Sequence, residues 1–508
     1  MAVARVFSAQ PSLTSADIVT LETDLSRGLF AFTIVGLPGK AVEEARDRVN
    51  SAIKNSNLPS PKSENHKVVI SLAPADLKKE GPLFDLPMAL SYLIAKEDIR
   101  ADVSKILFIG ELSLDGTIRP VRGVLPIVRK ALSAHFSEVV VPYENREEAA
   151  LISGIRITPA HTLADVVRHI DTTRDDHSRI PEVPPTQIET LWSESAVRLE
   201  DVRGQESAKR GLMIAAAGRH NVIMVGPPGT GKTMLARALR GILPPLTREE
   251  ALEVTSIHSV AGTGESISLC PPFRAPHHTA SYIALVGGGT HPRPGEVTLA
   301  HKGVLFLDEF PEFERRAIDA LRQPLEDRVV SISRVQASAL FPADFILVAA
   351  MNPTRGGDER GDYTQQMLQT YKHKISGPIL DRIDLWLSVP HIDYDTLTEK
   401  RNSRPEGAQS ETDCAREQII RARERQYERF KGSGITANGE MSSRDIDERV
   451  HMTPVVRDLL KRSAEKLGLS PRSYHRLIKV SQTIADLDDS PDLKESHVLE
   501  ALHYRVKM

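Results

Sequence analysis

The chain has 508 residues, of which 40% are hydrophobic, and its formal net charge at pH 7 is −3. This length predicts about three domains, and the near-neutral charge gives no global basic field for nucleic acid. The two cysteines, Cys270 and Cys414, lie too far apart in sequence to indicate a disulfide framework or a metal cluster, which favours a reducing cytoplasm. No apolar stretch approaches the roughly 20 residues of a membrane span, and we recognise no secretory signal, so no membrane partner is expected.

Residues 1–172 alternate strand-like runs with helical stretches, and they predict an α/β domain. Residues 173–198 are charged and contain prolines, which is typical of a linker. In the first domain we expect strands at 18–23, 31–35, 67–72, 106–109 and 138–141, and helices at 41–56 and 147–152.

A second α/β block is predicted over residues 199–395. It is followed by a polar segment at 396–414 without an apolar face, which we expect to be a surface loop. The tail, 415–508, is expected to be largely helical because apolar residues recur there at helical spacing. These residues are Val455, Leu459 and Leu460, and then Leu477, Val480, Ile484 and Leu487.

A glycine-rich phosphate-loop pattern stands in the second block, between an apolar run at 222–225 and a helical pattern at 234–243. Glycines let backbone N–H groups surround phosphate oxygens, and the following helix directs its positive end at them. We expect Lys232 to neutralise the β- and γ-phosphates and Thr233 to hold Mg²⁺. The sequence therefore predicts a bound nucleoside triphosphate. The loop consists of Gly226, Pro227, Pro228, Gly229, Thr230, Gly231, Lys232 and Thr233.

Two further strands of this block end in polar side chains. The apolar run 304–307 is followed by Asp308, which we expect in the Mg²⁺ shell, and by Glu309, which we expect to polarise the attacking water. The run 345–351 is followed by Asn352, a candidate to hold the same water, although an Asn-Pro pair after a strand is also a simple turn. A glutamate in this place favours hydrolysis over mere binding.

These motifs together resemble an AAA+ ATPase of the magnesium-chelatase-like branch, and more narrowly the ComM/YifB family. The resemblance implies a hexameric ring with ATP and Mg²⁺ between neighbouring subunits. It implies that Arg382 is a finger that reaches the neighbour's γ-phosphate and that Arg472, in a helical lid, contacts ATP of its own subunit, with Arg476 as the rival for that role. The motifs that carry it lie at 201–205, 226–233, 273–281, 285–301, 304–309, 349–353, 376–384 and 473–487.

Two segments are candidates to contact a polymer in the channel of such a ring. The first is a long insertion at 245–302, whose candidate side chains are expected to stack on bases or pair with phosphates. These residues are Phe273, Arg274, His277 and His278. The second is a predicted hairpin at 329–341, in which Arg334 is the expected phosphate contact. The alternative is that these side chains pack within their own segments.

Residues 68–130 resemble the proteolytic domain of Lon-type enzymes, which implies such a fold at the N-terminus. A serine–lysine dyad needs a hydroxyl nucleophile and an amine base, but Leu83 and Leu125 stand at the two aligned positions. We therefore expect the fold without proteolysis. The cysteine cluster that relatives often carry after Met351-Asn-Pro is also absent here, so the resemblance implies no zinc site.

The resemblance implies a cytoplasmic, ATP-driven DNA motor of the branch-migration type, which promotes integration of incoming single-stranded DNA during natural transformation and recombination. The alternative is a chelatase-type or chaperone-type ATPase that remodels a protein partner. Both hypotheses use the same ATPase residues, so the site motifs alone leave the choice open.

Overall fold

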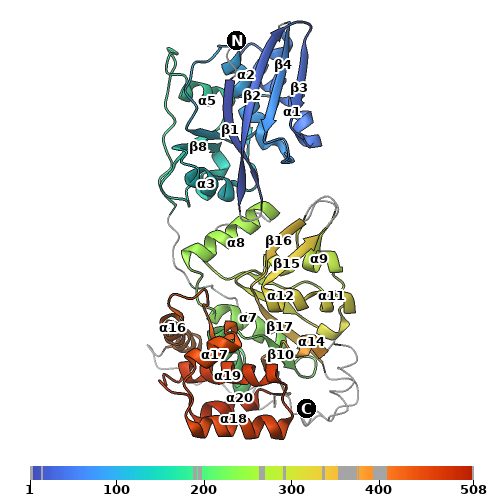
Figure 1. Cartoon of the computed structure of the whole chain (residues 1–508), viewed down its shortest axis with the longest axis vertical. Coiled ribbons are helices and arrows are strands. Elements are labelled where there is room, and N and C mark those ends of the chain that lie inside the picture. The colour runs from blue at the N-terminus through green and yellow to red at the C-terminus, as the bar shows by residue number, and fades with distance from the viewer. Residues whose placement is uncertain are drawn as a thin grey trace. The chain divides into compact units, whose positions relative to one another are not determined.

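The structure is a computed structural model of the chain, which divides into two compact units. Unit 1 comprises Met1–Glu189 together with Ala251–Ser268, and unit 2 comprises Thr190–Glu250 together with Leu269–Met508. Figure 1 shows the elements of each unit, coloured from blue at the N-terminus to red at the C-terminus. The structure describes residues 4–12, 15–63, 65–186, 192, 197–262, 269–289, 293–333, 338–352, 375, 377–392 and 409–505.

Unit 1 is built on a seven-stranded mixed sheet with the strand order β3-β4-β2-β1-β5-β8-β9. Strand β2 pairs antiparallel with both β1 and β4, and all other neighbours in this sheet pair parallel. All five predicted strands are present, whereas β1 and β9 were not expected. The strands are β1 (Ala4–Pro11), β2 (Ala16–Arg27), β3 (Ala31–Val35), β4 (His66–Ala73), β5 (Ile106–Phe108), β8 (Glu138–Pro142) and β9 (Arg156–Ala160).

Figure 1 shows the helices of unit 1 beside this sheet. Helices and sheet share one hydrophobic core. The two leucines at the positions of the Lon-type dyad belong to that core: Leu83 is 4% exposed and Leu125 is 1% exposed. Both positions therefore serve packing. The helices are α1 (Lys40–Asn55), α2 (Asp85–Ala95), α3 (Val124–Ser133), α4 (Arg146–Ala149) and α5 (Leu163–Ile170), and a small pair of strands is formed by β6 (Glu111–Leu112) and β7 (Ile118–Arg119).

Helix α8 (Arg248–Ala261) follows the phosphate-loop helix in sequence, yet from Ala251 onward it belongs to unit 1. Leu252 packs against the core of this unit, and the Ser259 hydroxyl accepts a hydrogen bond from Gly123 N at 3.0 Å. The same hydroxyl donates to Glu148 Oε1 at 2.6 Å, and burial raises the pKa of that carboxyl. The predicted second block, 199–395, therefore differs from the structure over residues 251–268.

Unit 2 contains a five-stranded parallel sheet with the order β11-β14-β17-β10-β18. Its central strands are continuous apolar runs, as parallel strands covered on both faces require. Two small antiparallel pairs, β12 with β13 and β15 with β16, stand beside it. The strands are β10 (Val222–Val225), β11 (Phe273–Arg274), β12 (Gly287–Gly288), β13 (Arg293–Pro294), β14 (Val304–Leu307), β15 (Val329–Ser333), β16 (Ser338–Pro342), β17 (Ile346–Met351) and β18 (Leu385–Ser388).

The C-terminal helices of unit 2 share a hydrophobic core with its sheet. The two sets of helically spaced apolar residues in the tail lie in α18 and α19, which confirms that prediction. Among the described residues, no helix has the length and apolar character needed to cross a membrane. The helices of unit 2 are α6 (Glu206–Gly218), α7 (Lys232–Ile242), α9 (Tyr282–Val286), α10 (Glu296–Leu299), α11 (Arg315–Ala320), α12 (Arg322–Asp327), α14 (Gly377–Leu380), α16 (Glu411–Phe430), α17 (Ser443–Arg449), α18 (Pro454–Leu467), α19 (Pro471–Leu487) and α20 (Glu495–His503).

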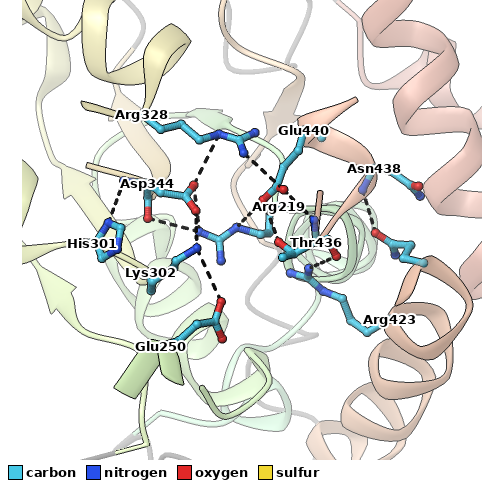
Figure 2. A network of polar contacts seen from close by, with 12 residues as sticks. Arg219, Glu250, His301, Lys302, Arg328, Asp344, Arg423, Thr436, Asn438 and Glu440 are labelled. Atoms are coloured by element: carbon cyan, nitrogen blue, oxygen red, sulfur yellow. Dashed lines mark hydrogen bonds and ion pairs between the residues drawn. The ribbon is translucent and has the colours of Figure 1, made fainter. Parts of the chain in front are cut away.

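A network of charged side chains joins the sheet of unit 2 to its C-terminal part (Figure 2). Asp344 pairs with Arg219 at 3.1 Å, with Lys302 at 2.8 Å and with Arg328 at 3.6 Å. Glu440, on the other side of the same cations, pairs with Arg328 at 3.3 Å and with Arg219 at 3.6 Å. Burial opposes ionisation of Asp344, but these three cations more than offset it and hold its pKa well below the ordinary value.

The variant Asp344→Asn is expected to lower the free energy of unfolding of unit 2 by about 3–5 kcal/mol, because it leaves buried cations without their counter-charge. Urea denaturation measures this change. The pKa of Asp344 is lower in the folded chain than in the unfolded one, so its contribution is complete above about pH 4 and is lost as the pH falls below that value.

Asp458→Asn is the matched control for this prediction, since Asp458 forms an i,i+4 pair with Arg462 on the surface, where the side chains are 53% and 77% exposed. Such a pair contributes about 0–1 kcal/mol. Equal losses in the two variants would contradict a structural role for the Asp344 network.

Candidate functional site

The phosphate loop connects β10 to α7, and its glycines are required by the backbone. A Cβ atom on Gly226 would lie 2.0 Å from the carbonyl oxygen of Val389. Gly229 and Gly231 have φ values of 80° and 90°, a left-handed region that L side chains avoid. No heavy atom lies within 4 Å of a Cβ built on either of them, so the loop is open on that side.

Lys232 and Thr233 begin α7, where the N–H groups of the first turn are available to an anion. Lys232 Nζ donates to the carbonyl oxygens of Gly226 and Pro227, each at 2.7 Å, which places its charge inside the curve of the loop. Burial lowers the pKa of Lys232, and the charge of Asp308 opposes that shift. A phosphate chain fits this arrangement because amide donors and an ammonium group converge on one open concavity.

The magnesium ligands expected from the sequence are adjacent in the structure. Thr233 Oγ1 donates to Asp308 Oδ2 at 3.1 Å, which joins the start of α7 to the end of β14. A hydroxyl and a carboxylate are hard oxygen donors of the kind that Mg²⁺ prefers, and it takes its remaining ligands from water and substrate phosphates. The side chains present therefore fit MgATP, with Thr233 and Asp308 as the protein's contribution to the metal.

Glu309 follows Asp308 in a left-handed backbone conformation, with φ at 50°, and its side chain is exposed. Such a conformation is costly outside glycine and tends to occur where function requires it. The Glu309 backbone N–H donates to Asp308 Oδ1 at 2.9 Å, so the Asp308 carboxylate is held against the backbone of Glu309. Asn352 follows β17, the neighbour of β14 in the parallel sheet, and thus lies at the same carboxyl edge.

His278, which the sequence suggested as a polymer contact, instead lies beside Glu309 of this site. Its Nδ1 lies 3.1 Å from Glu309 Oε2, and its ring lies against that of His277 with centroids 4.1 Å apart. His278 comes shortly after β11, which is the other neighbour of β14. The signal was available in the sequence, because the carboxyl ends of neighbouring parallel strands meet at one edge, but the two-residue strand β11 was not recognised.

Arg382 lies at the opposite edge of the sheet from the phosphate loop. It comes three residues before β18, whose first residue pairs with the first residue of β10. Asn221, just before β10, donates through Nδ2 to the carbonyl oxygen of Arg382 at 3.1 Å. Since the strands are four residues long at about 3.3 Å per residue, roughly 13 Å of sheet separates the two edges.

Arg472, at the start of α19, lies beside Arg382, because both guanidinium groups donate to the carboxylate of Glu326. This position does not fit the expectation that Arg472 contacts ATP bound to its own subunit, because the phosphate loop is at the far edge of the sheet. The rival Arg476 has its Nε 3.6 Å from Asp384 and donates to the carbonyl oxygen of Ile383. Of the two lid arginines, Arg472 is the more exposed, at 45% against 12%.

The expected polymer contacts are only partly available in the structure. Phe273 stacks on Phe306 with ring centroids 6.0 Å apart, and Arg274 donates to both carboxylate oxygens of Glu296 at 2.7 and 3.0 Å. In this structure these two side chains brace the edge of the sheet, and their role as DNA contacts stays a prediction. His277 is exposed, and Arg334 lies outside the described residues.

Family models of three kinds match the chain. "Magnesium chelatase, subunit ChlI" matches residues 198–397, "Subunit ChlI of Mg-chelatase" matches 21–145, and "Magnesium chelatase, subunit ChlI C-terminal" matches 409–505. These matches agree with the parallel sheet, the phosphate loop and the C-terminal helices described above, and they are typical of AAA+ ATPases of the magnesium-chelatase type.

Curated relatives cover nearly the whole chain. Competence protein ComM of Haemophilus influenzae is 42% identical over 99% of this chain and 98% of its own length. The uncharacterized protein YifB of Escherichia coli is 41% identical over 97% of this chain and 94% of its own. The magnesium-chelatase 67 kDa subunit of Chlorobaculum parvum is 29% identical over only 32% of this chain and 24% of its own. The chain therefore belongs to the ComM/YifB family of magnesium-chelatase-like AAA+ ATPases.

Proposed function

We propose that this protein assembles into a hexameric ring and hydrolyses ATP at each contact between neighbouring subunits. The observation that carries the proposal is the separation of two half-sites by the parallel sheet. Lys232 and Glu309 lie at its carboxyl edge, whereas Arg382 and Arg472 lie together at its amino edge. One subunit does not bring both edges to one nucleotide, but head-to-tail neighbours in a closed ring do.

In the assembled site each side chain has a distinct task. Lys232 binds the β- and γ-phosphates, and Thr233 and Asp308 hold the Mg²⁺ that neutralises them. The Glu309 carboxylate takes a proton from the attacking water, which Asn352 helps to orient. From the next subunit, Arg382 and Arg472 stabilise the charge that develops on the transferred γ-phosphoryl group. Both arginines thus act on a neighbour's ATP.

We further propose that the ring moves branched DNA and so promotes integration of incoming DNA during natural transformation and recombination. The similarity to a competence protein over nearly the full length supports this. So do the leucines at positions 83 and 125, which leave unit 1 without the Lon-type nucleophile and base. His277 and the β15–β16 hairpin with Arg334 are the proposed DNA contacts. The alternative substrate is a protein partner, as for a chelatase-type or chaperone-type remodelling ATPase.

Migration of a fluorescent four-way DNA junction tests the choice of substrate. We expect the protein with MgATP to move the junction, and we expect DNA to stimulate ATP turnover. Lys232→Ala is the control and should show neither effect. ATP turnover that is indifferent to DNA, together with a stationary junction, would refute the DNA part of the proposal and leave the protein-remodelling alternative.

A further inference from the structure

Glu326 is the fifth residue of α12. Its carboxylate forms ion pairs with both arginines of the amino-edge half-site, Arg382 and Arg472. Arg382 donates through Nη2 to Oε2, and Arg472 donates through Nη2 to Oε1. The Glu326 side chain is 46% exposed, whereas the Arg382 side chain is only 9% exposed. The carboxylate thus holds the two guanidinium groups side by side at a surface of unit 2.

A second hydrogen bond, to the backbone, also holds the guanidinium group of Arg382 in place. Its Nη1 donates to the carbonyl oxygen of Pro378 at 2.6 Å, and within the described part of the chain its buried Nε has no hydrogen-bond partner. Burial raises the pKa of Glu326, but its contacts with Arg382 and Arg472 lower it, and the net shift is downward. Glu326 is therefore ionised at neutral pH, and one negative charge serves two positive ones.

The surrounding pocket, of about 570 Å³, has the same imbalance. Six arginines and lysines line it, against four aspartates and glutamates. The three acids other than Glu326 are paired with other cations: Asp344 and Glu440 share Arg219 and Arg328, and Asp384 pairs with Arg476. Among the described residues that line this pocket, Glu326 is therefore the one acid that pairs with Arg382 and Arg472. Because two positive charges face one negative charge, binding of a second anion beside them is electrostatically favoured.

We propose that Glu326 is an electrostatic latch, which holds Arg382 and Arg472 until the γ-phosphate of ATP in the neighbouring subunit takes them. The inference rests on the proposed ring. A terminal phosphate offers three oxygens and more negative charge than a carboxylate, and arginine pairs strongly with it. Exposed ion pairs such as Arg472–Glu326 are weak and readily exchanged. ADP lacks the γ-phosphate, so it does not release the arginines from Glu326.

The latch makes closure of the subunit contact depend on ATP. In the variant Glu326→Gln the side chain keeps its shape, but the pair of arginines carries an uncompensated double charge. That charge attracts the phosphates of ADP as well as those of ATP. We therefore expect the variant to assemble with ADP. We also expect about a fivefold fall in the protein concentration needed for assembly with a slowly hydrolysed ATP analogue, since the Arg472–Glu326 pair is exposed and such pairs are of modest strength.

Mass photometry over a range of protein concentrations, with ADP and with ATPγS, tests the latch. Asp327→Asn is the matched control. Asp327 is the next residue of α12 and is exposed, and its substitution removes the same negative charge. Wild type and Asp327→Asn are expected to form rings with ATPγS only, whereas Glu326→Gln and Glu326→Ala are expected to form rings with either nucleotide.

Two results would overturn the latch while leaving the ring intact: Glu326 variants that assemble as Asp327→Asn does, or Glu326 variants that need more protein than wild type with ATPγS. The second result would mean that Glu326 only braces the arginines for catalysis. A wild-type protein that stays monomeric with ATPγS at every concentration would instead refute the ring itself, and the latch with it.

Discussion

The variant Glu309→Gln is expected to lower ATP turnover by about two to four orders of magnitude and to leave ATP binding intact. The amide has the size of the carboxylate, but it cannot accept the proton of the attacking water. Lys232 and the Thr233–Asp308 pair are unchanged in this variant, so the phosphates and Mg²⁺ keep their partners. Turnover is measured by phosphate release, and binding by the fluorescence of a labelled ATP.

Glu312→Gln is the control, because Glu312 lies in the same turn after β14 and is exposed. It should turn over ATP at the wild-type rate. Lys232→Ala should lose both binding and turnover, which separates the two roles. If Glu309→Gln hydrolysed ATP normally, Glu309 would not be the general base.

The second large effect is expected from the arginines of the amino edge. Arg382→Ala should lower ATP turnover by about three to five orders of magnitude, the range that arginine fingers contribute to phosphoryl transfer. The folded state should be little affected, since Glu326 retains Arg472 as its partner. The measurement is again phosphate release, at a protein concentration at which the wild type forms rings.

Mixing two inactive variants distinguishes action within a subunit from action between subunits. Lys232→Ala keeps its arginines, and Arg382→Ala keeps its phosphate loop, so a mixed ring contains complete sites where the two meet. At equal amounts roughly a quarter of the contacts should be complete, because each contact takes its two halves at random from head-to-tail neighbours. The same recovery is expected for Arg472→Ala with Lys232→Ala. Mixtures that remain inactive would mean that each arginine serves its own subunit.

The elements that the sequence predicted well are those whose pattern is local. The runs 222–225 and 304–307 are recognisable as buried parallel strands because every side chain in them is apolar. Helix α2 (Asp85–Ala95) was not predicted, because its apolar residues show no helical period. It is buried on nearly all sides, so it has no polar face to give a helical period, and it contains Pro87.

In the candidate site, too, the residues of local motifs were predictable from the sequence, whereas contacts between residues far apart in the chain were not. The phosphate loop and the Asp308–Glu309 pair are contiguous motifs, so their residue types alone indicate their chemistry. Glu326 is 56 residues from Arg382 and 146 residues from Arg472, and no periodicity in the chain links them. Their meeting depends on how α12 and α19 pack. The placement of Arg472 relative to the phosphate loop was therefore not predictable from its own motif.

Helix α8 has a consequence for how the chain can be divided. Its sequence position assigns it to the nucleotide-binding part, whereas Leu252 and Ser259 complete the packing and hydrogen bonding of unit 1. A fragment cut at residues 173–198 would carry this helix away from Glu148 and Gly123 and would leave its apolar side exposed to water. Unit 1 is thus discontinuous in the sequence, and the two units of this protein are better studied as one polypeptide than as separately expressed pieces.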